Sequence, residues 1–458
     1  MRFVENGDVF SMGSEAHAAS HEKDVAIFRG NSNNAPVVEP IAAATSRQGQ
    51  DIRMARPRKL YIAMVGLPAM GKSTIAAKIK ENLEKDDIKV GIFNNGDVRR
   101  RMIPGNTSHP GFYDPSNAQA VALRERIAAV NFAEAKAFLS ADGDIAILDA
   151  TNVSRKRRET LREQLPNHPV LFVECINDDP ELLALSVARK TRLPEFADLS
   201  EAEAKASFVT RIGYYRHIYE PPHEVRDLVR LDTLNNRILA EHVSGDVPYY
   251  GRIRDLLMSD WIKNLFLVRH AESEYNVKDR VGGNASLTEK GRRQAWALSR
   301  HFIGTPLPYI FTSTLTRTLE MAEPLLETRK GTTIHHAFPE FDEIAVGACE
   351  GMSYAEIERD MPDLFAARAR NKYNFVYPGG EGYATMAGRV YRGIKKAIYL
   401  SGNSEHIMII GHQAVNRMIL SDFLFRRAED VPYIFIPQDK YFHIVSTQTK
   451  KLFELRKY

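Results

Sequence analysis

Residues 60–74 read LYIAMVGLPAMGKST, an apolar run followed by a loop with two glycines and a Lys-Ser pair. The stretch fits the pattern G-x-x-x-x-G-K-[ST], in which Gly66 and Gly71 let backbone N–H groups wrap around a phosphate chain. Lys72 would place its charge at the β- and γ-phosphates, and the Ser73 hydroxyl would bind Mg²⁺. A chance glycine turn of this form arises about once in a hundred chains of this length. The stretch therefore predicts a buried strand, a nucleoside-triphosphate loop and a helix.

Length and composition limit which kind of protein this chain can be. The chain has 458 residues, 44% of them hydrophobic, which is enough for two or more domains with their own cores. A net charge of +4, from 62 basic and 58 acidic residues, is too small to predict a nucleic-acid partner. No apolar run approaches the ~20 residues of a membrane span, so we expect a cytoplasmic protein with no membrane partner. Cys175 and Cys349 form no metal pattern and are expected to be reduced thiols.

The first half of the chain alternates short apolar runs with amphipathic segments. Runs at 90–95, 145–150 and 170–176 are separated by segments such as 121–139. This alternation is typical of an α/β fold whose mostly parallel sheet is covered on both faces. Residues 1–56, rich in Ser, Asn, Ala and Gly, are expected to form a flexible tail. The segment from 221 to about 260 is expected to be helical and mixed, ending in GRIRDLLMSD at 251–260.

Polar residues at the ends of these runs are candidates for ligand binding, because parallel sheets bind ligands at the carboxyl ends of their strands. Asp149 ends one run and is expected to hold Mg²⁺ together with Ser73. Arginines are also numerous in this half, among them Arg99, Arg100, Arg124, Arg155, Arg157, Arg158 and Arg211. Arginine binds phosphate bidentately, and the triphosphate already has its loop, so the surplus suggests a second anion, the acceptor substrate.

A second domain is expected to begin at Trp261, just before LFLVRHAESEYN at 265–276. The apolar residues predict a buried strand that delivers Arg269 and His270 at its end. Two further runs end in the same way, with Arg317 after FTS at 311–313 and His412 after IMIIG at 407–411. Gly282, Gly283 and Gly291 are expected to lie in loops.

Two histidines and two arginines at the ends of three strands suit phosphoryl transfer. A neutral imidazole can attack phosphorus while the guanidinium groups and the second imidazole hold the oxygens. The leaving alkoxide needs a general acid that holds a proton near neutral pH, and Glu343 is the candidate.

Taken together, the motifs resemble the bifunctional 6-phosphofructo-2-kinase/fructose-2,6-bisphosphatase family, from about residue 58 to nearly the end of the chain. They occur in order as GLPAMGKS (66–73), GDVRR (96–100), DPSN (114–117), LDATN (148–152), FVECINDDP (172–180), LVRHAESEYN (267–276), TSTLTRT (312–318), EIAVGACEGMSYAEI (343–357), RARNKYNFVYPGGE (368–381) and GHQAVNR (411–417). The resemblance implies a P-loop kinase domain at 57–260 and a histidine-phosphatase domain of phosphoglycerate-mutase-like α/β fold at 261–458. Members of the family usually form homodimers.

The resemblance implies that the first domain transfers the γ-phosphate of ATP to the 2-hydroxyl of fructose 6-phosphate. Residues that would hold ATP and Mg²⁺ are Gly66, Gly71, Lys72, Ser73, Thr74, Asp149 and Asn177. Residues that would hold the sugar phosphate are Arg99, Arg124, Lys190 and Arg211, with Thr151 beside the transfer site.

For the second domain, the resemblance implies hydrolysis of fructose 2,6-bisphosphate through a phosphohistidine on His270, a reaction pair that controls glycolysis and gluconeogenesis. The transferred phosphoryl group would be bound by Arg269, Asn276, Arg317 and His412, and Glu343 would protonate the leaving oxygen. The other phosphate would be held by Tyr354, Arg368, Lys372, Gln413 and Arg417.

Two alternatives stay open. Ala271 stands where the family usually has a glycine after the histidine, which would fit a kinase-dominant enzyme with a weak phosphatase. The other alternative is a non-catalytic sensor or scaffold that binds nucleotide and phosphosugar.

Overall fold

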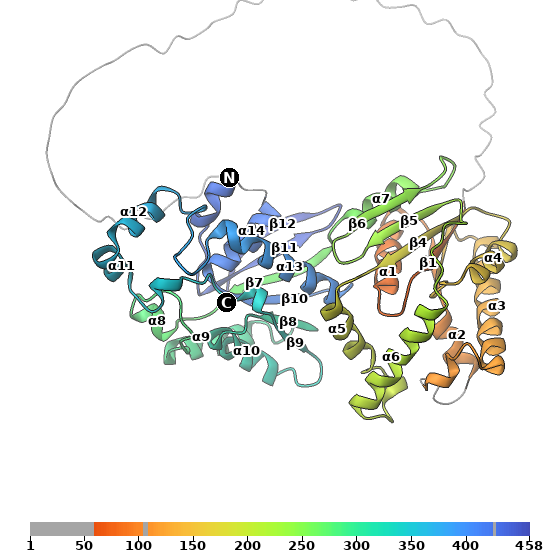
Figure 1. Cartoon of the computed structure of the whole chain (residues 1–458), viewed down its shortest axis with the longest axis horizontal. Helices are drawn as coiled ribbons and strands as arrows, with labels where there is room; N and C mark the ends of the chain where they lie inside the picture. Colours follow the sequence, from red (N-terminus) through yellow and green to blue (C-terminus); the bar gives the residue numbers. More distant parts are fainter. Residues whose placement is uncertain (1–58, 104–108, 425–426) are drawn as a thin grey trace, which may run out of the picture. The chain divides into compact units, whose positions relative to one another are not determined.

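The apolar run Leu60–Val65 forms strand β1, which is buried on both faces (Figure 1). Side chains of a strand alternate between the two faces of its sheet. Leu60, Ile62 and Met64 accordingly pack in one core cluster, and the residues between them pack in another. The loop after β1 leads into helix α1 (Lys72–Leu83), as the motif predicts.

The computed structural model describes residues 59–103, 109–424 and 427–458. The predicted tail, residues 1–56, lies outside this part of the chain. Within it, no helix is long and apolar enough to cross a membrane. The two cysteines are buried and form no disulfide, as expected.

The first sheet has the strand order β2-β3-β1-β4-β5-β6. Its other strands are β2 (Val90–Asn94), β3 (Ile145–Asp149), β4 (Val170–Ile176), β5 (Leu228–Asp232) and β6 (Arg237–His242). All neighbours pair in parallel except β5 and β6, which are antiparallel. The predicted mostly parallel sheet is therefore confirmed.

The expectation that residues 221 to about 260 are helical was wrong for most of that segment. It holds β5, β6 and only one helix, α7 (Tyr250–Met258). The apolar residues Val229 and Leu231 alternate along β5, and both are fully buried in the core that α1 and α7 cover. An alternating pattern of this kind favours a strand.

Helices cover both faces of the first sheet. The helices of this half of the chain besides α1 and α7 are α2 (Asn95–Met102), α3 (Ala118–Ser140), α4 (Arg155–Gln164), α5 (Pro180–Lys190) and α6 (Glu201–His217). Side chains of α3 and α4 pack on one face, and those of α1 and α7 pack on the other.

The second sheet has the order β12-β11-β7-β10-β8-β9. Its strands are β7 (Ile262–Arg269), β8 (Tyr309–Thr312), β9 (Ile334–Ala337), β10 (Ile407–Gly411), β11 (Lys440–Ser446) and β12 (Lys451–Lys457). The four strands β7 to β10 are parallel, and β11 and β12 extend the sheet in antiparallel fashion.

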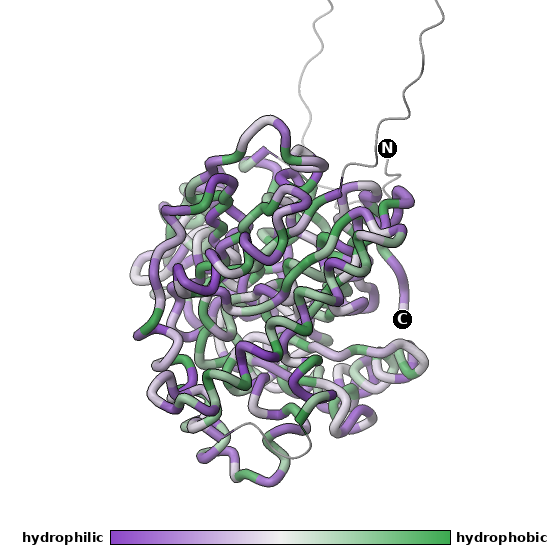
Figure 2. The backbone as a smooth tube through the Cα atoms, turned by 90° about the vertical axis from the view of Figure 1, so that its right-hand side faces the viewer, coloured by the Kyte–Doolittle hydropathy of each residue, from purple (hydrophilic) through white to green (hydrophobic). Residues whose placement is uncertain are grey.

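Helices also cover both faces of the second sheet. The helices of this half of the chain are α8 (Glu274–Val277), α9 (Glu289–His301), α10 (Thr316–Glu327), α11 (Tyr354–Asp360), α12 (Pro362–Arg370), α13 (Tyr383–Ser401) and α14 (Gln413–Leu424). Leu265 and Leu267 of β7 pack against α13 and α14, whereas Phe266 and Val268 pack against α9 and α10. In Figure 2, hydrophobic stretches of backbone run through the middle of the view and hydrophilic residues are frequent at its periphery.

Gly291 lies in α9 and not in a loop, contrary to the sequence-based expectation. A Cβ atom at this position would lie 2.1 Å from the carbonyl oxygen of Glu272. The glycine is therefore needed because α9 packs closely against the chain at Glu272, and it does not mark a turn.

We predict that Gly291→Ala destabilises the second sheet by about 1–3 kcal/mol, because the methyl group overpacks a closed contact. This loss should outweigh the gain of about 1 kcal/mol that alanine brings to a helix. Calorimetry of the full chain should show a lower unfolding midpoint. Gly304→Ala is the control, because a Cβ atom there would have no other described atom within 4 Å. Equal midpoints for the two variants would contradict the packing argument.

Candidate active sites

The glycine loop after β1 has the backbone geometry that its motif predicts. Gly66 adopts φ +134°, and a Cβ atom there would lie 2.5 Å from the carbonyl oxygen of Cys175. The N–H of Gly66 donates to the carbonyl oxygen of Thr151 at 2.9 Å, which ties the loop to the end of β3. Only glycine fits this position, because both the φ value and the close approach exclude a side chain.

Lys72, Ser73 and Asp149 meet at the start of α1. Nζ of Lys72 donates to the carbonyl oxygen of Leu67 at 2.6 Å. Burial lowers the pKa of Lys72 to about 8, although the nearby carboxylate of Asp149 opposes this shift. The Ser73 hydroxyl donates to Oδ2 of Asp149 at 2.6 Å, and Nδ2 of Asn94 donates to the same oxygen at 2.6 Å. A hydroxyl and a carboxylate side by side are the oxygen ligands that Mg²⁺ prefers, so these residues fit the ion.

The nucleotide loop lines a cavity of about 500 Å³. The predicted residues that line this nucleotide cavity are Gly71, Lys72, Ser73, Thr74, Arg99, Asp149, Thr151, Lys190 and Arg211. An adjoining cavity of about 460 Å³ shares Arg99, Thr151 and Arg211 with it and adds Arg124. Two of the predicted nucleotide-binding residues, Gly66 and Asn177, are not among the described residues that line either cavity. Asn177 instead accepts the backbone N–H of Asp179 at 3.0 Å in the turn before α5.

Arg99 and Arg211, which line both cavities, each have an N–H group that donates to no described acceptor. Arg99 hydrogen-bonds Glu195 and the hydroxyl of Tyr113, and the guanidinium of Arg211 lies 4.0 Å from the centre of the Tyr113 ring. In the described part of the chain, Nε of Arg99 and Nε of Arg211 are nevertheless buried without an acceptor. Buried donors of this kind are costly unless a ligand binds them, so they point to an anion.

Sequence reasoning missed Asn94, Tyr113 and Glu195. Asn94 is the last residue of β2 and lies near the end of the apolar run at 90–95, so its position was a usable signal. Tyr113 and Glu195 lie in short turns between helices, where no strand end or glycine pattern marks them.

His270 lies at the end of β7, and His412 follows the end of β10. Their ring centres are 5.1 Å apart. Nδ1 of His270 lies 2.7 Å from the carbonyl oxygen of Ala271. A carbonyl oxygen only accepts hydrogen bonds, so Nδ1 holds the proton and Nε2 keeps its lone pair. Burial, and then the charges of Arg317 and Arg269, lower the pKa of His270 well below its ordinary value, which leaves a neutral imidazole.

His412 is held at both ring nitrogens. Nε of Arg317 donates to Nδ1 of His412 at 3.2 Å, so Nε2 of His412 holds the proton. That nitrogen lies 2.7 Å from the hydroxyl oxygen of Ser313, which in turn lies 2.7 Å from the hydroxyl of Thr318. His412 is fully buried, and burial lowers its pKa well below the ordinary value. Ser313 was not predicted as a site residue, although it directly follows β8.

The carboxylate of Glu343 lies at the N-terminus of α14. It accepts the backbone N–H of Ala414 at 3.2 Å and that of Val415 at 3.4 Å. It also accepts the N–H of Ile344 at 3.0 Å. These bonds fix the position of the carboxylate at the rim of the cavity that holds His270.

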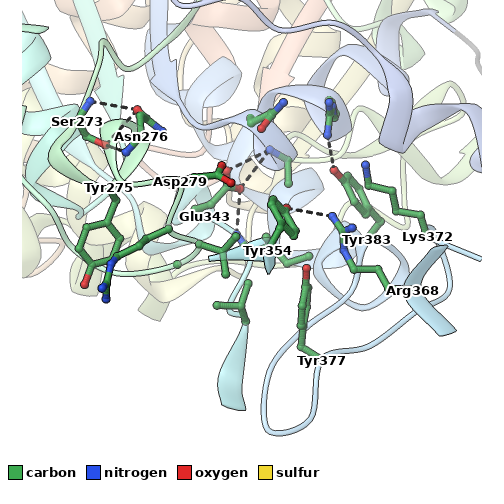
Figure 3. Close-up of a pocket in the computed structure, with 18 of the residues that line it drawn as sticks. Ser273, Tyr275, Asn276, Asp279, Glu343, Tyr354, Arg368, Lys372, Tyr377 and Tyr383 are labelled. Atoms are coloured by element: carbon green, nitrogen blue, oxygen red, sulfur yellow. Dashed lines mark hydrogen bonds between the residues drawn. The ribbon is translucent and has the colours of Figure 1, made fainter. Parts of the chain in front are cut away.

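This phosphatase cavity, of about 570 Å³, brings together almost all predicted residues of the second site. Those that line it are Arg269, His270, Asn276, Arg317, Glu343, Tyr354, Arg368, Lys372, Gln413 and Arg417. Figure 3 shows Asn276 on one side of the pocket and Arg368 and Lys372 on the other. His412 is not among the described residues that line this cavity, and it contacts the cavity residue Arg317 through a hydrogen bond.

The far side of this cavity is rich in cations and phenols. Arg368 donates to the hydroxyl of Tyr354 at 3.1 Å, and Arg417 donates to the hydroxyl of Tyr383 at 2.9 Å. Burial and the two nearby arginines lower the pKa of Lys372 to about 8. Tyr383 was missed by sequence reasoning, because a tyrosine at the start of an amphipathic helix has the pattern of a core residue.

Comparisons with known proteins agree with this arrangement. Residues 47–250 match the family model of 6-phosphofructo-2-kinase, and residues 265–456 match that of the histidine phosphatase superfamily (branch 1). The chain is 32% identical over 393 residues to 6-phosphofructo-2-kinase/fructose-2,6-bisphosphatase 3 of Rattus norvegicus, which covers 82% of this chain and 68% of that relative. It is 31% identical over 403 residues to the 6-phosphofructo-2-kinase/fructose-2,6-bisphosphatase of Gallus gallus, which covers 85% and 83% respectively.

Among solved structures, the α-ribazole phosphatase from Shigella flexneri aligns with 43% of this chain and 96% of its own, at 22% identity and a TM-score of 0.40. The kinase model matches the part of the chain that forms the first sheet, and the phosphatase model matches the part that forms the second. The relatives align with 82% of the chain or more, which includes residues of both parts. The chain therefore belongs to the bifunctional 6-phosphofructo-2-kinase/fructose-2,6-bisphosphatase family.

Proposed function

We propose that this chain phosphorylates fructose 6-phosphate at its 2-hydroxyl with ATP in the first site and hydrolyses fructose 2,6-bisphosphate in the second. The observation that carries the proposal is that both sites bury an arginine Nε with no acceptor among the described residues: Arg99 and Arg211 in one site, and Arg269 in the other. Each group lies where a phosphate of the substrate would supply the acceptor. We also propose the domain boundaries 57–260 and 261–458.

In the kinase site, the residues act mainly by position and charge. Lys72 binds the β- and γ-phosphates of ATP, and Ser73 and Asp149 hold Mg²⁺, which neutralises charge on the phosphates when bound. The sugar phosphate is bound by Arg99, Arg124, Lys190 and Arg211, with Thr151 between the two cavities. A loose transition state needs little acid or base chemistry from the protein.

In the phosphatase site, Nε2 of His270 attacks the phosphorus of the 2-phosphate, and the bond from phosphorus to O2 of the sugar breaks. Arg269, Arg317 and Asn276 bind the phosphoryl oxygens, His412 holds Arg317 through Nδ1, and Glu343 gives a proton to O2. Water then attacks the phosphohistidine, Glu343 takes the proton of that water, and phosphate leaves. The other phosphate is held by Tyr354, Arg368, Lys372, Gln413 and Arg417.

The geometry gives no support to a weak phosphatase. The methyl group of Ala271 is fully buried and belongs to the core cluster that contains Phe266 and Val268. It is not among the described residues that line the phosphatase cavity. We therefore propose that both reactions turn over. The cytoplasmic location stays a prediction from the apolar pattern of the sequence, and the homodimer stays a prediction from the family resemblance.

Separate substitutions at the two sites should separate the two activities. We predict that Asp149→Ala lowers formation of fructose 2,6-bisphosphate by about 10²-fold or more and leaves its hydrolysis intact. His270→Ala should lower hydrolysis by about 10³-fold or more, because no nucleophile remains, and should spare formation. Assays of both reactions on both purified variants make each variant the control for the other. If neither variant loses turnover, the sensor alternative is the better account.

The hydroxyl of Ser313 should matter for the phosphatase through His412. We predict that Ser313→Ala lowers the rate of phosphohistidine formation about 5- to 50-fold, because a buried N–H of His412 loses its acceptor. Rapid-quench measurement of labelled enzyme checks the rate. Ser299→Ala is the control, since Ser299 is similarly buried in the same half and bonds the carbonyl oxygen of Pro324. Equal rates in both variants would show that Ser313 does not position His412.

Nucleotide affinity should fall at alkaline pH. Lys72 is protonated below its pKa of about 8, so its attraction for phosphate is nearly complete at pH 7 and is lost as the pH rises through 8. We predict that the Kd for ATP, measured by calorimetry, is nearly flat from about pH 6.5 to 7.5 and then rises by up to about tenfold per unit. Lys72→Arg keeps its charge and should give a flat profile to about pH 9.5. A rise of the same size in this variant would assign the titration to another group.

A further inference from the structure

The C-terminal end of α13, a helix of the phosphatase sheet, contacts the nucleotide loop of the kinase sheet. The hydroxyl of Tyr399 donates to the carbonyl oxygen of Ala69 at 2.9 Å. Two residues beyond the helix, Nδ2 of Asn403 donates to the carbonyl oxygen of Thr74 at 3.1 Å. Both acceptors belong to the loop or to the first turn of α1, so two side chains from one half of the chain hold the backbone of the other half's loop.

The position of Tyr399 is well fixed. Its side chain is only 9% exposed, and burial raises the pKa of its hydroxyl, which therefore stays a donor. A Cβ atom on Gly71 would lie 3.4 Å from the tyrosine ring, so the ring packs against the loop glycine as well. Tyr399 is not among the described residues that line the nucleotide cavity, whereas Ala69 and Gly71 do line it. The tyrosine thus contacts the loop from outside the cavity.

The bond to Ala69 constrains the direction of a neighbouring donor. Ala69 adopts φ +66°, a left-handed conformation that is uncommon for a residue with a side chain. In a trans peptide the carbonyl oxygen and the following N–H point in opposite directions. A carbonyl held toward Tyr399 therefore directs the N–H of Met70 away from Tyr399. Loops of this type bind phosphate through such N–H groups.

Ion pairs hold α13 in place one and two turns before Tyr399. Lys396 is fully buried and binds Glu181 of α5 at 2.5 Å and Glu340 at 2.8 Å. Arg392 binds Asp179, the residue that caps the N-terminus of α5, at 2.8 Å. A buried cation that lost its partners would be costly, so these contacts define one position of α13 against the kinase sheet.

We propose that Tyr399, assisted by Asn403, is a positioning residue for the kinase reaction: it holds the nucleotide loop in its phosphate-binding conformation from the phosphatase half of the chain. This inference rests on the proposed nucleotide site. Nucleotide affinity then depends on a hydroxyl that does not touch the nucleotide and lies 330 residues from Ala69 in the sequence.

The test is Tyr399→Phe in the full chain, a change that removes the hydroxyl and keeps the ring. We expect the Kd and the KM for ATP to rise about 3- to 10-fold, as loss of one hydrogen bond predicts. The kcat of the kinase should change less than about twofold, and hydrolysis of fructose 2,6-bisphosphate should stay unchanged. Asn403→Ala should raise the same Kd. A merely structural role would lower the unfolding midpoint without this split between KM and kcat.

Tyr391→Phe is the matched control, since Tyr391 lies on the same helix and is 45% exposed. It should leave the Kd for ATP at the wild-type value. The inference is overturned if wild type binds ATP and Tyr399→Phe binds it equally well. If wild type itself does not bind ATP, the proposed nucleotide site fails, and the two failures are thereby distinguished.

Discussion

Positive charge held largely out of water is the constraint on which both sites depend. Burial lowers the pKa of Lys72 to about 8 in one cavity and does the same to Lys372 in the other. Burial likewise lowers the pKa of Arg269 and Arg317, which lie beside the neutral imidazole of His270. Keeping these groups together costs free energy, which the packing of the surrounding strands offsets. A bound phosphate relieves that cost, so both sites are organised for phosphate before it arrives.

The parallel sheets explain where this charge gathers. β1 and β7 are buried on both faces, so polar groups are tolerated only where such strands end. For the same reason much of the molecule could be predicted from the sequence alone: apolar runs marked the central strands, and the polar residues after them were Asp149, His270 and His412. The glycine loop was equally predictable, because its spacing follows from the shape of a phosphate chain.

The remaining parts depend on contacts between distant segments, which a local pattern does not contain. β5 was missed although Val229 and Leu231 alternate along it, and β6 was missed because its residues are mostly exposed at the edge of the sheet, where no apolar pattern marks a strand. Gly291 was placed in a loop because a glycine often marks a turn. Glycine is needed there because the carbonyl oxygen of Glu272, which is distant in the sequence, lies too close for a side chain. The phosphate-binding side of the second cavity, with Tyr354 and Arg368, was found only through family resemblance, since α11 and α12 have no strand-end signal. Ser313 and Tyr399 act through other residues, and only the three-dimensional structure shows which ones.

Helix α13 has 19 residues, which corresponds to a length of about 28 Å. Its first residue, Tyr383, lines the phosphatase cavity and bonds Arg417, while its far end bonds the nucleotide loop. One rigid helix thus contacts both the phosphatase cavity and the nucleotide loop, the sites of two opposing reactions. Because the ion pairs of Lys396 and Arg392 hold this rod in one position, a displacement at either end would have to break them.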